Sequence, residues 1–281
     1  MSDRLAVLAL PFLACLVLTS IHTYLGIHVV MREVIFVDIA LAQLAALGAT
    51  IALLAGHEPA GGWTYALSLG ATLLGAAFLS LTRSRARKIP HEAVIGMVYV
   101  ASAALGILLA DRLPHGLEHL KALLTGNIVW VTPGELLRTA LLYAAIGAVH
   151  IACRRAFFEI SRDAEGARSR GRNVRGWDFL FYATFGIVVT SSVRMAGVFL
   201  VFAYLIAPAV MGMLLAERVR ARLAVGWVTG AGASLAGMAF AYDRPAGPAI
   251  VCALALLLAT GAAFVAMREA TMIGGRPRMR P

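Results

Sequence analysis

Residues 195–216 read MAGVFLVFAYLIAPAVMGMLLA, a run of 22 residues without a single Asp, Glu, Lys or Arg. An apolar helix of about 20 residues spans the ~30 Å hydrocarbon core of a bilayer. It can do so because each backbone N–H and C=O is satisfied within the helix. Eight other stretches of fifteen or more residues are free of charge or carry only Asp38: 5–31, 34–56, 61–82, 93–110, 139–153, 179–193, 223–242 and 245–267.

The composition agrees with a membrane-embedded chain. Hydrophobic residues make up 60% of the sequence, charged residues 14%, and the mean hydropathy is +0.81. An average soluble domain has roughly 45–50% apolar and about 25% charged residues. We therefore predict an all-α, polytopic transmembrane bundle of eight or nine spans, forming one domain over residues 1–281. The run 122–134 is too short to cross, so we interpret it as interfacial or re-entrant.

The basic residues indicate the orientation of the chain. The net charge of +10 could suggest nucleic acid, but Lys and Arg gather at the ends of apolar runs, as the positive-inside rule requires. The basic clusters are 83–88, 154–175, 218–222 and 268–280. They fall on alternate loops, so we place these loops in the cytoplasm and the N-terminus outside. Membrane orientation accounts for the positive charge, and we expect no nucleic acid among the partners. We expect 5–31 to be a retained helix, because no small-residue cleavage site follows it. The alternation of basic loops gives nine membrane crossings. Because the turn expected around Arg194 is very short, eight crossings are the alternative.

The polar stretch 154–177 is the most informative segment outside the apolar runs. It is too small to bury a core of its own, and the sequence has no GxxxxGK[ST] phosphate loop. Energy for transport would then come from a partner or an ion gradient. Within the stretch, Asp163 and Glu165 suit the positive N-terminus of a short helix, and Gly171 suits a left-handed stop. The segment is either a solvated basic loop or a helix that docks on a cytoplasmic partner.

The spacing Asp163-x-Glu165-x-Ala167-x3-Gly171 resembles the coupling segment of the zinc/manganese/iron-type ABC transporter permeases. Other segments are similar to that family in the same order along the chain: GIHVVMR at 26–32, IG at 95–96 with ALG at 104–106, LTGNI at 124–128, GVFL at 197–200 with LIAPA at 205–209, and PAGPAIV at 245–251. Each match is short, but together they run through nearly the whole sequence.

The resemblance implies a multi-pass permease in the cell membrane that alternates access to a path for a divalent metal ion or a metal chelate. Two copies would form the path, and an external metal-binding protein would deliver the cargo. Separate ATPase subunits would bind the loop 154–176 through Asp163, Glu165, Ala167 and Gly171. This chain would be no enzyme and hold no cofactor, since ATP belongs to the partner.

Three residues are candidates for the transport pathway: Asp38, Gln43 and Glu92. A carboxylate in a spanning helix costs about 2.5–3.5 kcal/mol at the bilayer centre, so Asp38 usually faces a cavity or a partner. The alternative to a cavity is a local ion pair supplied by Arg32 and Glu33, one or two turns earlier. Gln43 stands where the family usually has a histidine, and Asp38 is one residue out of step with the usual aspartate. A neutral amide is a poor zinc ligand, so either the cargo is a different metal or a chelate, or the pathway uses other ligands than the usual histidine. Glu92 either gates the cytoplasmic mouth or simply favours a helix N-terminus.

Histidines supply the remaining candidate ligands. His115 and His119 are four residues apart in an external loop with Glu118 between them, which could give a transient metal site with Asp38 as a separate ligand elsewhere. The alternative for this pair is that both imidazoles are simply solvated at the surface. His22, His28 and His150 lie within apolar runs and are interpreted as packing residues or ligands.

Two other classes of function are considered. A gradient-driven secondary transporter would work without an ATPase and would need coupling carboxylates near the bilayer midplane. The apolar runs contain few acidic residues, which argues against it. An intramembrane zinc protease would need HExxH, but His91-Glu92 is followed by Ile95 at the second ligand position.

Overall fold

The computed structural model describes residues 2–82, 90–241 and 245–274, and these residues are helical throughout apart from short connections. The basic cluster 83–88, residues 242–244 and the arginines at 276–280 lie outside the described residues. The helices are α1 (Ser2–Met31), α2 (Val37–Leu54), α3 (Gly62–Thr82), α4 (His91–Ala110), α5 (Gly116–Thr125), the 3₁₀ turn η1 (Ile128–Trp130), α6 (Pro133–Ala152), α7 (Arg154–Arg162), α8 (Ala164–Ser169), α9 (Val174–Leu215), α10 (Val219–Phe240) and α11 (Ala246–Gly274).

Within the described residues, eight helices are long and apolar enough to cross a membrane: α1–α4, α6 and α9–α11. Large apolar side chains such as Leu74, Met97, Leu108 and Val228 point outward and are more than half exposed. A water-soluble protein rarely displays such a surface over its whole circumference, whereas a lipid-facing helix needs one. The all-helical, polytopic bundle predicted from the sequence is confirmed.

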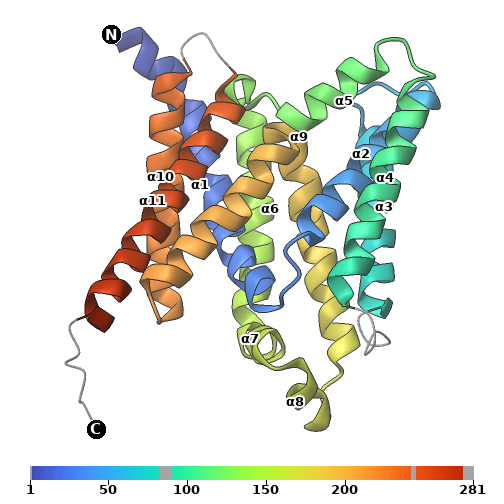
Figure 1. Cartoon of the computed structure of the whole chain (residues 1–281). Coiled ribbons are helices and arrows are strands. Elements are labelled where there is room, and N and C mark those ends of the chain that lie inside the picture. The colour runs from blue at the N-terminus through green and yellow to red at the C-terminus, as the bar shows by residue number, and fades with distance from the viewer. Residues whose placement is uncertain (1, 83–89, 242–244, 275–281) are drawn as a thin grey trace, which may run out of the picture.

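Helix α9 contains a sharp reversal rather than a straight span. Gly197 has φ 77° and ψ 161°, a conformation outside the helical region, and the two helical segments 174–196 and 198–215 meet there. Figure 1 shows the first segment rising from α8 and the second descending toward α10. Counting α9 once gives eight spans, and counting its two segments gives nine crossings.

The turn expected around Arg194 lies three residues later. Arg194 is still helical, and its guanidinium donates a hydrogen bond to the carbonyl of Ala60 and lies 5.2 Å from the ring centre of Tyr65. The reversal takes place at Gly197 because a backbone with that φ and ψ is essentially restricted to glycine.

The connections divide between two ends of the bundle (Figure 1). The α1–α2 turn, α7, α8 and the α9–α10 turn lie at one end, which we call the basic end because it carries the arginines of 154–175 and 218–222. Helix α5 and the start of α1 lie at the opposite end. This arrangement matches the alternation of basic loops in the sequence.

Helices α2 and α9 form the interior of the bundle. Helix α2 packs against α3, α4 and α9, while α9 also packs against α1, α10 and α11. Small residues permit the close approaches: a Cβ on Gly226 would lie 2.4 Å from Thr23, and one on Gly230 would lie 2.3 Å from Thr19. The Gly226–Gly230 spacing therefore brings α10 against α1, as close helix packing in membranes requires.

The run 122–134 does not form a span. It contains the end of the ten-residue helix α5, the η1 turn and the first residues of α6. Ten helical residues reach only about 15 Å, half the hydrocarbon thickness. Gly126, with φ 65°, brings this connection against the reversal of α9, where a Cβ on either Gly126 or Gly197 would collide with the other's backbone region.

Candidate functional site

Asp38 lies in the first turn of α2 and is buried, with 1% of its surface exposed. Its Oδ1 has no hydrogen-bond partner among the described residues. The ion pair with Arg32 considered from the sequence is wrong, because Nη1 of Arg32 donates to Oδ1 of Asp178 at 2.7 Å, and Glu33 is exposed. A buried carboxylate oxygen without a hydrogen-bond partner is costly, so Asp38 remains a candidate for contact with a transported cation.

Gln43 is buried one and a half turns further along α2. It lines a cavity of about 290 Å³ between α2, α4, α5 and the second segment of α9. Tyr99 is the other polar-tipped side chain in the lining, and Leu124, Val198 and Phe199 belong to its apolar wall. Asp38 and Glu92 do not line this cavity, so the three pathway candidates do not share it.

Glu92 connects two helix ends at the basic end of the bundle. It occupies the first turn of α4, and its Oε1 accepts a hydrogen bond of 2.8 Å from the backbone N–H of Phe36. Phe36 precedes α2, two residues before Asp38. Glu92 therefore joins the start of α4 to the α1–α2 turn and lies at the same end as Asp38.

The histidine pair in the outer loop does not form a complete site. His115 occupies the N-cap position of α5 in a left-handed conformation without a capping hydrogen bond from its side chain. Its Nδ1 lies 3.3 Å from the Glu118 carboxylate, and both side chains are more than three-quarters exposed. Among the described residues, no group of three His, Cys, Asp or Glu side chains could hold a metal ion. A metal role for His115 and His119 stays a prediction.

The segment between α6 and α9 folds into two short helices. Asp163 ends α7 and begins α8, and its side chain accepts a hydrogen bond of 2.8 Å from the N–H of Gly166. Gly171 has φ 83° just beyond the end of α8. The short helix with an acidic start and a left-handed glycine stop is thus present as predicted.

The side chains of α8 divide into an exposed and a buried face. Glu165 and Arg168 are exposed, whereas Ala167 is fully buried against Ile160 and Val174. Glu159 of α7 accepts hydrogen bonds from Arg170 at 3.0 Å and from Arg172 at 2.6 Å. These guanidinium groups, first that of Arg172 and then that of Arg170, hold the pKa of the Glu159 carboxyl below its usual value. Ala167 therefore supports α8 from within, and its exposed neighbours form the surface that a partner can reach.

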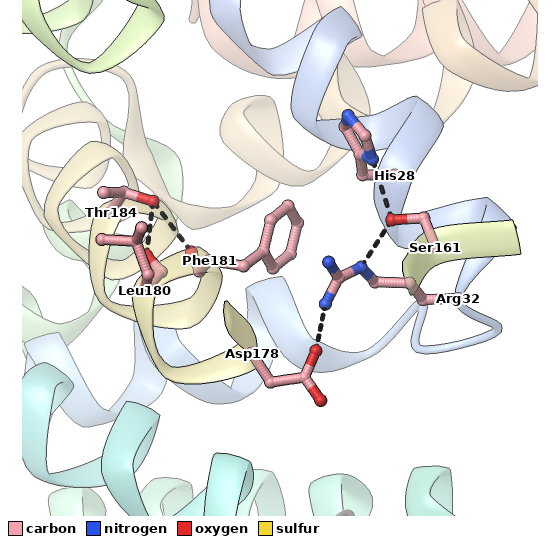
Figure 2. A network of polar contacts seen from close by, with 7 residues as sticks. All are labelled: His28, Arg32, Ser161, Asp178, Leu180, Phe181 and Thr184. Carbon is pink, nitrogen blue, oxygen red and sulfur yellow. Dashed lines mark hydrogen bonds and ion pairs between the residues drawn. The ribbon is translucent and has the colours of Figure 1, made fainter. Parts of the chain in front are cut away.

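Sequence reasoning did not find the polar cluster shown in Figure 2, which we call the buried clamp: Arg32, Ser161 and Asp178, with His28 beside them. Nε of Arg32 donates to Oγ of Ser161 at 2.8 Å, and His28 Nδ1 shares a 2.9 Å hydrogen bond with the same hydroxyl. His28 and Arg32 are four residues apart at the end of α1, so they lie on one face. That spacing was the only sequence signal, since Ser161 and Asp178 are more than 120 residues away.

The other buried histidines also have hydrogen-bond partners. Nε2 of His22 lies 3.1 Å from Oγ of Ser192, and Nε2 of His150 lies 2.9 Å from Oγ1 of Thr184. The His150 ring stacks on Phe157 with centres 4.4 Å apart. These contacts fit packing residues, one of the two interpretations from the sequence, although Nδ1 of His150 has no hydrogen-bond partner among the described residues.

Residues 5–265 match the model of the ABC 3 transport family. The chain belongs to this family. Among curated proteins it is similar to a "probable metal transport system membrane protein" of Chlamydia pneumoniae (24% identical, covering 89% of this chain and 86% of the relative). A "probable iron transport system membrane protein" of Haemophilus influenzae is also 24% identical, covering 91% and 93%. A "manganese transport system membrane protein" of Listeria innocua is 26% identical over 61% and 60%.

Two solved structures share the fold. One is PsaBC of Streptococcus pneumoniae in complex with a Fab, with a TM-score of 0.76 at 22% identity, covering 92% of this chain and 93% of the other. The second is an inward-facing conformation described as a putative metal-chelate type ABC transporter, with a TM-score of 0.69 at 17% identity, covering 91% and 85%. Its membership of the ABC 3 transport family makes the protein a multi-pass permease subunit of an ABC transporter, in which the ATPase is a separate subunit.

Proposed function

We propose that this permease forms the membrane path of an ATP-driven importer for divalent metal ions or a metal chelate. The family match over residues 5–265 carries the proposal, and the relatives' names point to manganese and iron as cargo. The permease works in the cell membrane as a pair of identical subunits. Cytoplasmic ATPases bind at the basic end, and an external metal-binding protein docks at the end that carries α5.

Helix α8 is the contact for the ATPase. It projects from the basic end of the bundle beyond α7 (Figure 1), and its exposed side chains, including Glu165 and Arg168, surround a shallow groove. Asp163 caps the start of the helix, and Gly171, with its positive φ, ends it. When the ATPases close on ATP, α8 moves with them, and the two permeases rotate as rigid bodies to change the side on which the path is open.

Asp38 and Gln43 contact the cargo in different ways. The Asp38 carboxylate is a hard oxygen ligand suited to manganese or iron, whereas the Gln43 amide binds zinc poorly. Gln43 and the apolar cavity beside it accommodate a partly hydrated ion or a chelate. Glu92 sets the position of the α1–α2 turn, and Asp38 follows that turn in the first turn of α2.

The test is uptake into proteoliposomes that contain the permease, its cognate ATPase and its binding protein, measured separately for manganese, iron and zinc. We expect ATP-dependent uptake of at least one metal, and none with an ATPase that cannot hydrolyse ATP. Uptake by the permease alone down a proton or sodium gradient would favour the secondary transporter. Absence of ATP-dependent uptake of every metal and of their chelates would contradict the proposal.

A further inference from the structure

We propose that Arg32, Ser161 and Asp178 of the buried clamp transmit the movement of the α7–α8 segment to α1 and α9, which makes them positioning residues for transport. The inference rests on the proposed function, because it requires an ATPase that displaces α8. It assigns a role to a cluster that touches neither the cavity nor the exposed face of α8.

Helices α7 and α8 move as one unit because they are fastened to each other. They share Asp163, and Ala167 of α8 packs on Ile160 of α7. The ion pairs from Glu159 to Arg170 and Arg172 close the segment on its outer side. A displacement of α8 therefore carries α7 with it.

The unit is attached to the spanning helices through one face of α7, and Ala167 of α8 also packs on Val174 at the start of α9. Phe157 contributes ring contacts to Phe181, with centres 6.0 Å apart, and to His150. The hydrophobic burial of these rings is non-directional, so it restrains a sideways shift of α7 less than a hydrogen bond does. The Ser161 hydroxyl instead makes hydrogen bonds to Arg32 and His28, which weaken steeply when their geometry is lost. The hydrogen bonds of Ser161 therefore transmit a displacement of α7 to α1.

Arg32 extends the connection to α9. Its guanidinium donates to Asp178 and lies 4.0 Å from the ring centre of Phe181, so one buried side chain contacts α7 and α9 from the end of α1 (Figure 2). The side chains of Arg32 and Asp178 are 0% and 2% exposed. Replacing a buried ion pair by apolar residues is often neutral or stabilising. Its value here is that it fixes the relative position of three helices.

The first segment of α9 carries the movement across the bundle. From Asp178 to Gly197 it extends about 28 Å at 1.5 Å per residue. At its far end lies the reversal, followed at once by Val198 and Phe199 in the wall of the cavity beside Gln43. A tilt imposed at Asp178 thus changes the wall of the cavity, although the two places share no side chain.

Two variants break this connection in the assembled transporter. Ser161→Ala removes the hydroxyl but keeps the ion pair, and the double variant Arg32→Met/Asp178→Leu removes both charges without leaving either one buried alone. Ser234→Ala is the matched control, since Ser234 is equally buried and its hydroxyl bonds Tyr204 far from α7. For each, ATP hydrolysis and metal uptake are measured in the same proteoliposomes, with co-purification of the ATPase as the check on assembly.

We expect both variants to bind the ATPase and hydrolyse ATP, while metal taken up per ATP falls by about fivefold or more. Ser234→Ala should keep the wild-type ratio. A wild-type ratio for Ser161→Ala overturns the inference, and so does an equal loss in Ser234→Ala. If the double variant does not assemble, Ser161→Ala alone decides. Failure of the proposed function looks different, because the wild-type complex itself would then show no ATP-dependent uptake.

Discussion

Gly197→Ala tests whether the reversal inside α9 depends on a residue without a side chain. At φ 77° and ψ 161° a residue with a Cβ is strained by about 1–3 kcal/mol. The added Cβ would also lie 2.3 Å from the backbone nitrogen of Gly126. Such overpacking costs typically about 1–3 kcal/mol, which brings the expected loss of stability to roughly 2–6 kcal/mol.

The measurement is the thermal unfolding midpoint of the detergent-purified permease, followed by loss of monodisperse protein on heating. A loss of this size lowers the midpoint by several degrees or more. Gly232→Ala is the matched control, because a Cβ there meets nothing within 4 Å and Gly232 lies inside α10. That substitution should be neutral or stabilise by about 0.5–1 kcal/mol. A Gly197→Ala protein as stable as the wild type, or an equal loss in Gly232→Ala, would refute the reasoning.

Three further predictions concern the candidate site. Asp38→Asn should lower metal uptake without affecting assembly with the ATPase, and wild-type uptake would leave Asp38 a structural residue. Reversing the charges at Asp163 and Glu165 together should weaken ATPase co-purification while the permease still inserts into the membrane; unchanged transport would count against the docking role of α8. Because the pKa of Glu159 is lowered in the folded segment, its ion pairs stabilise α7–α8 at neutral pH and are lost as the pH falls below the ordinary value near 4.5. Amide exchange in 159–172 should therefore speed up, beyond the intrinsic pH effect, only in acid, and Glu159→Gln should show the faster exchange already at pH 7.

The spans were predictable because a helix in the hydrocarbon core must be apolar and nearly free of charged residues over about 20 positions. The ends of the spans were not predictable in this way. The charge-free run 179–193 misses the start of α9, which reaches back to Val174 and includes Asp178. Asp178 tolerates burial because Arg32 lies against it, and a window of neighbouring residues carries no information about a partner 146 positions away. Arg194 was wrongly predicted to lie in a turn. Its backbone stays helical, and its guanidinium contacts Tyr65 and the carbonyl of Ala60.

The candidate site was predictable where the signals were local. The acidic start and glycine stop of α8 depend on capping within a few residues, and both were found. The burial of Ala167 and the buried clamp depend on contacts between helices, which no single segment encodes. The pairing of Arg32 with Asp178 was missed for the same reason, and the ion pair with Arg32 was only one of the two alternatives left open for Asp38.

The reversal at Gly197 also bears on how the protein is made. With no linker residues between its two segments, α9 is a helical hairpin without a polar loop that could hold one half at the membrane surface during insertion. We expect both halves to partition into lipid together, and Arg194 to be carried across with them. A tag inserted after Gly197 should block biogenesis, whereas the same tag between α2 and α3 should be tolerated.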